Sequence, residues 1–144
     1  MDNITKESWS PGKLTWMLIL VFPIFALIYR QNRSVDGVEY IVAAGGQISY
    51  ETLPLGRYVS AVMWCTGDVT NSQLKHVVLA NPQECVDLSG NRRIDDEGVV
   101  EYLILLNAEI ELLDLRGTSV SSSGAERFFD THSRSTVLLG ETTQ

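Results

Sequence analysis

The order of apolar and polar residues in this chain recurs three times. The copies of the pattern begin at Val62, Val86 and Leu113, at intervals of 24 and 27 residues. In each copy two apolar residues stand two positions apart, as Val86 and Leu88 do, and a stretch with helical spacing follows. Residues two apart on a strand point to the same side of a sheet. Each copy therefore predicts an inward-facing strand, a turn and a helix.

Three polar residues and two glycines mark the predicted helices. Thr70, Asp96 and Ser122 each precede a helical stretch, and their side chains can accept hydrogen bonds from the first N–H groups of a helix. Gly98 and Gly124 stand inside the helices, at positions where the backbone is expected to be crowded. The pattern thus predicts both where the helices begin and where a side chain has no room.

A shorter unit stands at each end of the array. Residues 34–46 place apolar residues at helical spacing and end in a glycine pair that can adopt the left-handed conformation. Residues 47–50 alternate as a short strand, and residues 51–58 are expected to form a loop. Residues 136–142 predict a closing strand. Apolar residues that share one face are Val35, Val38, Ile41 and Val42 in the first unit, and Val137 and Leu139 in the last.

A charge-free apolar segment precedes the array. Residues 14–29 contain no charged residue, and Lys13 and Arg30 flank them. A membrane-spanning helix needs about 20 apolar residues, so the segment is slightly short, although flanking basic side chains can extend it. A cleaved signal peptide is the alternative, but the bulky end of the segment does not suit a cleavage site. We expect an uncleaved signal-anchor at 14–30, whose flanking charges leave its orientation open.

The motif copies resemble a known class of repeats. "VDLSGNRRIDDEGV" from Val86 and "LDLRGTSVSSSGA" from Leu113 are similar to leucine-rich repeats of the ribonuclease-inhibitor type, in particular those of planctomycete-type bacterial proteins. The phrase "AAGGQISY" resembles the cap that precedes such repeats. The resemblance covers residues 35–142, although Trp64 and the extra residue at Arg92–Arg93 depart from it. It implies a short α/β solenoid with parallel strands on one face and helices on the other.

The predicted organisation combines this domain with the anchor. Residues 1–13 form an N-terminal tail, and residues 14–30 form the transmembrane anchor. Residues 31–58 form a linker and a helix–strand cap. Residues 59–144 form about three leucine-rich repeats and a terminal strand. The predicted fold class is therefore an α/β solenoid preceded by one transmembrane helix, located in a membrane as a single-pass protein.

The charge of the chain narrows the class of its partner. The net charge is -7, and the excess of acidic residues falls entirely within residues 30–144. A nucleic-acid-binding surface needs clustered basic residues to follow the phosphate backbone. No such stripe is present in the sequence, so no nucleic-acid partner is expected.

The two cysteines are not expected to form a disulfide. In the predicted register Cys65 lies beside Ser89, and Cys85 lies four residues before Ser89. Four strand residues span about 13 Å, whereas the Cα atoms of bridged cysteines lie at most ~7 Å apart. The cysteine count does not identify the redox compartment.

Outward-facing strand positions form the candidate protein-binding site. They form two rows: Met63, Asp87 and Asp114 in one, and Cys65, Ser89 and Arg116 in the next. Neighbouring strands lie about 4.8 Å apart, so Asp87 and Asp114 are expected to be adjacent carboxylates that repel each other unless a cation intervenes. This face is either an acidic patch for a basic segment of a partner or a solvated face on which Arg116 neutralises its neighbour.

No catalytic or metal-binding constellation is predicted. Residues 87–98 match several positions of a calcium loop, but Arg92 and Gly98 stand where glycine and glutamate are required. His76 and His132 show no metal-ligand spacing with the cysteines, and His76 is expected on a helix surface. Nothing assembles a nucleophile, a base and an orienting group, so no cofactor is expected.

These patterns predict a non-catalytic protein that binds another protein through its strand face, and a lipid bilayer through residues 14–30. A structural or assembly subunit is the first alternative. In that case the short array completes itself against its own copy or within a larger membrane complex. An enzyme with an unrecognised site is the second alternative. The sequence does not identify the partner, the side of the membrane or the biological process.

Overall fold

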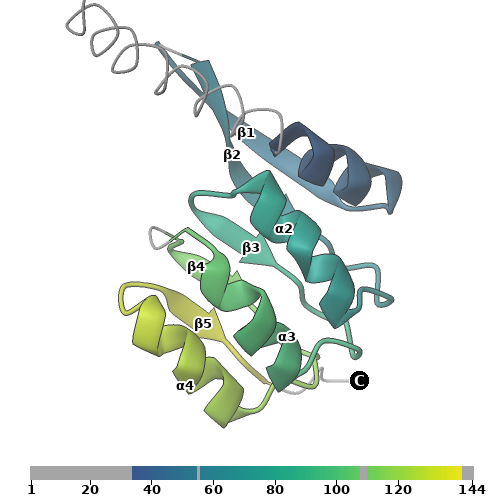
Figure 1. Cartoon of the computed structure of the whole chain (residues 1–144), viewed down its shortest axis with the longest axis vertical. Coiled ribbons are helices and arrows are strands. Elements are labelled where there is room, and N and C mark those ends of the chain that lie inside the picture. The colour runs from purple at the N-terminus through teal and green to yellow at the C-terminus, as the bar shows by residue number, and fades with distance from the viewer. Residues whose placement is uncertain (1–33, 55, 108–109, 141–144) are drawn as a thin grey trace, which may run out of the picture. The chain divides into compact units, whose positions relative to one another are not determined.

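The computed structural model describes residues 34–54, 56–107 and 110–140. The chain divides into two units, residues 1–32 and 33–144, and all described residues belong to the second. In that unit five strands form one sheet, and helices cover one of its faces (Figure 1). The elements are, in chain order, a helix at 34–43, β1 (Gln47–Leu53), β2 (Gly56–Met63), the 3-10 helix η1 (Asn71–Gln73), α2 (Leu74–Ala80), β3 (Cys85–Asp87), α3 (Asp96–Glu101), the 3-10 helix η2 (Leu103–Leu105), β4 (Leu112–Asp114), α4 (Ser122–Thr131) and β5 (Thr136–Leu138).

The sheet is mixed, and its strands follow the order of the chain. β1 pairs with β2 in antiparallel fashion, whereas β2 to β5 pair in parallel, each with the next. The parallel register aligns Val62 with Val86, Val86 with Leu113, and Leu113 with Val137. The motif spacing therefore predicted the register of these strands correctly.

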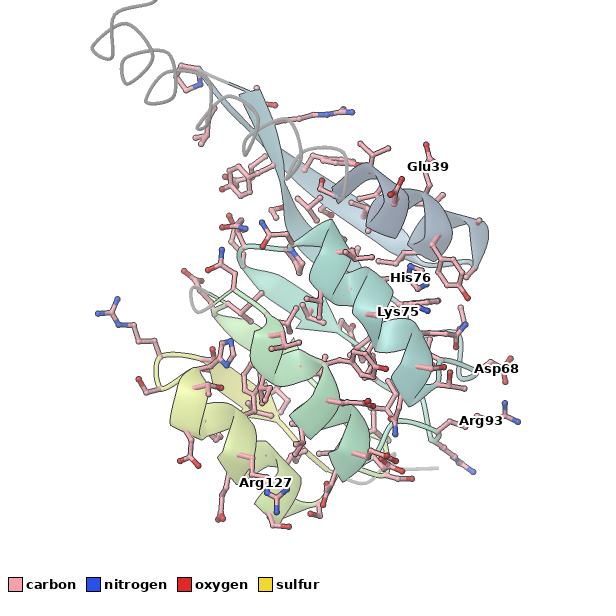
Figure 2. The ribbon with its side chains drawn as sticks, viewed as in Figure 1. Glu39, Asp68, Lys75, His76, Arg93 and Arg127 are labelled. Atoms are coloured by element: carbon pink, nitrogen blue, oxygen red, sulfur yellow. The ribbon has the colours of Figure 1, made fainter. Side chains whose placement is uncertain are left out.

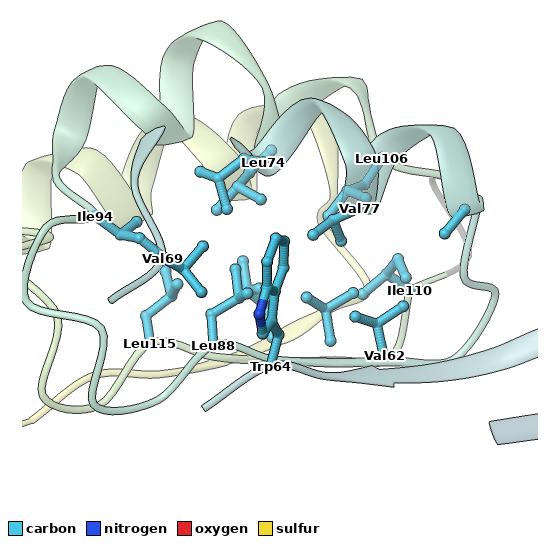
Figure 3. Close-up of a cluster of buried hydrophobic side chains, with 14 of the residues drawn as sticks. Val62, Trp64, Val69, Leu74, Val77, Leu88, Ile94, Leu106, Ile110 and Leu115 are labelled. Atoms are coloured by element: carbon cyan, nitrogen blue, oxygen red, sulfur yellow. The ribbon is translucent and has the colours of Figure 1, made fainter. Parts of the chain in front are cut away.

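The hydrophobic core lies between the sheet and the helices (Figure 3). Strands contribute the fully buried side chains of Val62, Val86 and Leu113, and α2 contributes Leu74 and Val77. Burial of each such side chain stabilises the fold by about 1.5–3 kcal/mol. Further buried members of the core are Trp64, Val69, Leu88, Ile94, Val99, Leu103, Ile110, Leu115 and Phe128. The two-residue alternation on the strands thus places every second side chain in the core.

Asn91 joins two successive turns inside the protein. Its side chain is fully buried, and its Nδ2 donates to the backbone oxygens of Trp64 at 2.6 Å and Leu88 at 2.8 Å. Its Oδ1 accepts from the N–H of Val69 at 3.1 Å. A buried polar group without partners is costly, so these three bonds make a buried asparagine tolerable and connect neighbouring motif copies.

Helix starts agree with prediction at one position and shift by one residue at two others. Thr70 forms the predicted N-cap, and the cap belongs to η1. Asp95 caps α3 in place of the predicted Asp96, and Ser121 caps α4 in place of the predicted Ser122. Asp96 and Ser122 are instead the first residues of α3 and α4. Sequence patterns place helix boundaries less accurately than they place helices.

Polar side chains connect the starts of neighbouring helices. Asn71 Nδ2 donates to Asp95 Oδ1 at 2.7 Å, and the N–H of Asp95 returns a bond to Asn71 Oδ1 at 3.2 Å. One unit further on, the N–H and Oγ of Ser121 donate to the carboxylate of Asp96 at 2.7 and 2.6 Å. Asp96 therefore does not cap its own helix, α3. Its carboxylate instead accepts hydrogen bonds from Ser121, the N-cap of α4.

Two helical glycines make room for these links. A Cβ atom at Gly98 would overlap the side chain of Asn71, and a Cβ atom at Gly124 would overlap the carboxylate of Asp96. The crowding predicted at both glycines is therefore confirmed, and its cause is the polar side chain of the preceding motif copy.

The N-terminal helix uses a narrower inward face than its sequence predicted. Ile41 is fully buried and Val38 packs against the core, but Val35 and Val42 are exposed. Gly37 lies against α2, where an added Cβ would stand 2.5 Å from the backbone nitrogen of Ala80. The close approach at Gly37 turns the helix so that its two outer valines face away from the core.

The predicted loop at 51–58 is a hairpin instead. Residues 51–53 belong to β1, residues 56–58 belong to β2, and the two strands pair from Gln47–Met63 to Leu53–Gly56. The register shifts between Ser49 and Tyr50, which marks a β-bulge. Pro54 and Gly56 stand at the turn of this hairpin, and such turn residues explain why the sequence pattern indicated a loop.

The predicted fold class and location need correction. The described sheet is mixed, not wholly parallel, so the solenoid description is not retained. In residues 34–54, 56–107 and 110–140, no helix is long and apolar enough to cross a membrane. Helix α4, for example, has 10 residues, about half of what a bilayer requires. The predicted anchor at 14–30 lies outside the described residues, and we withdraw the transmembrane, signal-anchor and single-pass membrane assignments.

Candidate functional site

The face of the sheet opposite the helices carries the predicted site residues. Within the described part of the chain no helix covers this face (Figure 1). Because side chains alternate along a strand, the neighbours of the inward valines and leucines point to this side. We define the strand face by three rows. Two of them are aligned by strand pairing: Ala61, Cys85, Leu112 and Thr136; and Met63, Asp87, Asp114 and Leu138. The third lies just beyond the strand ends, where hydrogen bonds continue the alignment: Cys65, Ser89 and Arg116.

Asp114 does not present a free carboxylate on the strand face. It is only 4% exposed, and Arg116 binds it with two nitrogens, Nε to Oδ1 at 3.0 Å and Nη2 to Oδ2 at 2.6 Å. The N–H of Arg116 also donates to Oδ1 at 3.0 Å. Burial raises the pKa of Asp114, but the hydrogen bonds and charge of Arg116 outweigh it and hold that pKa below its usual range. Of the two interpretations of this row, the structure favours neutralisation by Arg116 at Asp114.

Asp87 stands beside Asp114 in the same row and has a different environment. Its Oδ1 accepts the N–H of Ser89 at 2.9 Å, and its side chain is half-buried. Among the hydrogen bonds of the described residues, no basic side chain binds Asp87. Asp87 is therefore the acidic group of the strand face that a ligand can reach.

Met63 and Cys65 supply the exposed, weakly polar side chains at the β2 side of the strand face. Met63 is 36% exposed, and Cys65 is also exposed. The Cys65 thiol lies 3.5 Å from Ser89 Oγ, which confirms that these two residues share a row. Met63 shares its row with Asp87, as predicted. The sequence thus located all six candidate residues on one face, but it did not predict the burial of Asp114.

Both cysteines are free thiols. Burial raises the pKa of Cys65 and also that of Cys85, where the negative charges of Asp87, Asp114 and Glu84 add to the effect. A raised pKa keeps a thiol protonated, and the thiolate is the nucleophilic form. The arrangement does not activate either sulfur for chemistry at neutral pH.

A tyrosine and two glutamates form a cluster that sequence reasoning missed. The hydroxyl of Tyr58 lies 2.7 Å from Glu51 Oε2 and 2.8 Å from Glu84 Oε1. The hydrogen bond to Glu51 contributes most to raising the pKa of Tyr58, followed by the hydrogen bond to Glu84 and by burial. The three residues come from β1, β2 and the segment before β3, and the unpredicted hairpin brings them together. A tyrosine–glutamate pairing had no signal in the sequence because residues 51–58 did not suggest a strand pair.

The histidines serve packing in this structure. His132 is 2% exposed, stacks on Phe128 at 4.1 Å between ring centroids, and its Nε2 lies 3.0 Å from the backbone oxygen of Leu106. His76 stacks on Tyr40 at 3.6 Å, between the helix at 34–43 and α2 (Figure 2). It is therefore half-buried at a helix contact and not on a free helix surface as predicted.

The strand face offers contacts and no assembled chemistry. In the described ranges, no group of three or more His, Cys, Asp or Glu side chains could hold a metal ion. The residues of the predicted calcium-like stretch instead cap helices and join turns, as Asn91 and Asp95 do. The face combines small and medium-sized side chains with one accessible carboxylate, Asp87, and one guanidinium, Arg116.

No protein-family model, no curated protein and no solved structure matches this chain. The resemblance to leucine-rich repeats therefore rests on the sequence motifs and stays a prediction.

Proposed function

We propose that this chain is a non-catalytic protein-binding domain and that the partner protein rests on the strand face. The observation that carries this proposal is the separation of the two sheet faces: helices and core occupy one, and three aligned rows of outward side chains occupy the other. A broad surface without an assembled reactive group suits contact with another protein. Parallel strands keep the rows at regular spacing, so the partner meets a rigid surface.

The side chains of the strand face support this proposal. Ala61, Cys85 and Leu112 in the first row are small or medium-sized and half-buried, so the surface is low there. Met63 adds a flexible apolar side chain, and methionine adapts its shape to a partner. Apolar contact at the centre of an interface commonly supplies most of the binding energy.

Charge on the strand face would orient the partner. Arg116 is fixed by Asp114, yet its side chain remains 57% exposed. Asp87 stands on the adjacent strand, so one negative and one positive group lie close together. Exposed charges contribute more to specificity and association rate than to affinity. We therefore assign recognition energy to Met63 and its neighbours, and orientation to Asp87 and Arg116.

The test compares two variants that introduce the same charge on opposite sides of the sheet. Met63 on the strand face and Val100 on α3 are both 36% exposed. The full-length chain is used as bait in a lysate of its source organism, as wild type, Met63→Arg and Val100→Arg. We expect Met63→Arg to lose the bound protein and Val100→Arg to retain it, because only the first variant places a charged group in the contact.

Hydrogen exchange of the purified complex then locates the contact. Protection on binding is expected in residues 61–65, 85–89 and 112–116. Equal loss of the partner with both variants, or protection confined to the helices, contradicts the proposal. Thermal unfolding of each variant separates loss of binding from loss of fold.

A further inference from the structure

The first strand of the sheet has an unpaired edge. In the part of the chain that the structure describes, β1 pairs with β2 alone. β1 is seven residues long and contains neither proline nor lysine, the residues that commonly protect a strand edge. Its unpaired N–H and C=O groups are therefore available to another strand.

An exposed apolar stripe lies on the same end of the protein. Val35 and Val42 are seven residues apart, so they share one side of the helix at 34–43, and they are 49% and 54% exposed. Gly37 of the same helix lies against α2. At about 100° per residue, the two valines point roughly opposite to Gly37, away from α2 and toward the side on which β1 is unpaired.

We propose that β1 pairs with β1 of a second copy of this chain, antiparallel, with Tyr50 on the two-fold axis. This register opposes Tyr50 to its own copy, and aromatic pairs across neighbouring strands are favourable. It opposes Ile48 to Thr52, two β-branched residues. The two hairpins then form one continuous sheet across both copies.

Charge supports a second copy as the occupant. β1 carries a single charged residue, Glu51. With Tyr50 on the axis, Glu51 faces Ser49 of the second copy and not its own equivalent, so no like charges oppose each other along the paired strands. The strand is self-complementary in this register.

Among the described residues, no strand lies along the outer edge of the hairpin. The turn of the hairpin extends past the N-terminal start of the helix at 34–43 (Figure 1). A two-fold axis perpendicular to the sheet places the two helices toward opposite ends of the paired strands. It also keeps the helices of both copies on one side of the joined sheet. There the exposed apolar stripe of each copy, Val35 and Val42, borders the hairpin of the other. The two strand faces then lie side by side on the opposite surface.

The test uses opposite charges at one position. Ser49→Glu places a glutamate opposite Glu51 of the second copy twice per dimer, whereas Ser49→Lys places a lysine there. Sedimentation equilibrium of the full-length chain measures the dimer dissociation constant. We expect Ser49→Lys to dimerise at least about tenfold more tightly than Ser49→Glu, with wild type between them. High salt should reduce this difference.

A second pair of variants tests the valine stripe. Val42→Asp should weaken the dimer, and Val100→Asp on α3 serves as the matched control because it changes the same residue type away from the proposed contact. A wild-type chain that stays monomeric at high micromolar concentration overturns the proposal. So does a dimer whose dissociation constant is the same in Ser49→Glu and Ser49→Lys, because its contact would lie elsewhere. The Met63→Arg variant should dimerise normally, so failure of partner binding and failure of dimerisation are separate results.

Discussion

Individual buried polar residues hold the motif copies of this protein in register. Asn91 is the clearest case, because one side chain binds the backbone of three other residues. Asp114 is a second case, since its buried carboxylate forms an ion pair with Arg116. Such residues contribute to stability less through attraction than through the penalty for leaving a buried partner without a bond.

Replacement of Asn91 by alanine should destabilise the protein strongly. The change leaves the N–H of Val69 and the backbone oxygen of Trp64 buried without this partner. Each unsatisfied group costs about 1–3 kcal/mol, so for the two groups we expect the free energy of unfolding to fall by at least about 2 kcal/mol. Urea denaturation measures it. Ser119→Ala, which removes an exposed bond to the backbone oxygen of Arg92, is the control and should lose at most about 1 kcal/mol. Similar losses in the two variants would contradict this account.

The lowered pKa of His76 in the folded protein should make the free energy of unfolding depend on pH. Burial lowers the pKa of His76 from its ordinary value of 6.5, with a further contribution from Lys75, and its Nδ1 is buried without a hydrogen-bond partner among the described residues. The folded state therefore binds the proton less readily than the unfolded state. This contribution is fully present above pH 6.5 and is lost as pH falls through the lowered pKa.

Unfolding free energies measured from pH 8 to pH 5 test the assignment to His76. We expect a decline below pH 6.5 in the wild type and a smaller decline in His76→Gln, which cannot be protonated. Asp114 acts in a separate range: its lowered pKa makes its contribution present above the ordinary value of 3.8 and lost as pH falls through the folded pKa. A decline between pH 7 and pH 5 that is identical in both proteins would exclude His76 as its cause.

At the scale of elements, each helix start is built partly by the helix before it. Asp96 lies in the first turn of α3, yet its carboxylate receives Ser121 at the start of α4. Gly124 provides the space for this carboxylate. Helix order and strand order are therefore coupled, because a helix out of position would lose the polar link at its start.

The effect of Gly124→Ala on stability should depend on which residue stands at position 96: destabilising with aspartate there, and stabilising with alanine. In an isolated helix, alanine is more favourable than glycine by about 1 kcal/mol. In this protein the new Cβ would overlap the Asp96 carboxylate, so we expect a net loss of about 1–2 kcal/mol in the wild-type background. In the Asp96→Ala background the overlap is gone, and the same change should stabilise. A thermal double-mutant cycle measures both; a loss of equal size in the two backgrounds would refute the contact.

At the scale of the whole molecule, periodic positions were predictable and irregular ones were not. Val62, Val86 and Leu113 stand in the predicted register because burial of alternate residues determines which side chains face the core. The hairpin was not predicted, since Pro54 and Gly56 break the pattern and the bulge after Ser49 shifts it. The burial of Asp114 depends on the position that Arg116 adopts in the folded protein. The membrane assignment was made on residues 14–30 alone, outside the described structure.

The alternation on the parallel strands also separates positions that must be kept to preserve the fold from positions that can be substituted. Inward positions such as Val86 and Leu113 determine the fold, whereas outward neighbours such as Met63, Cys65 and Ser89 contribute little to the core. A combinatorial library at the outward positions could therefore be screened for new ligands while the scaffold stays intact. Asp114 is the position to leave unchanged in that library, because its buried pairing with Arg116 makes it part of the frame.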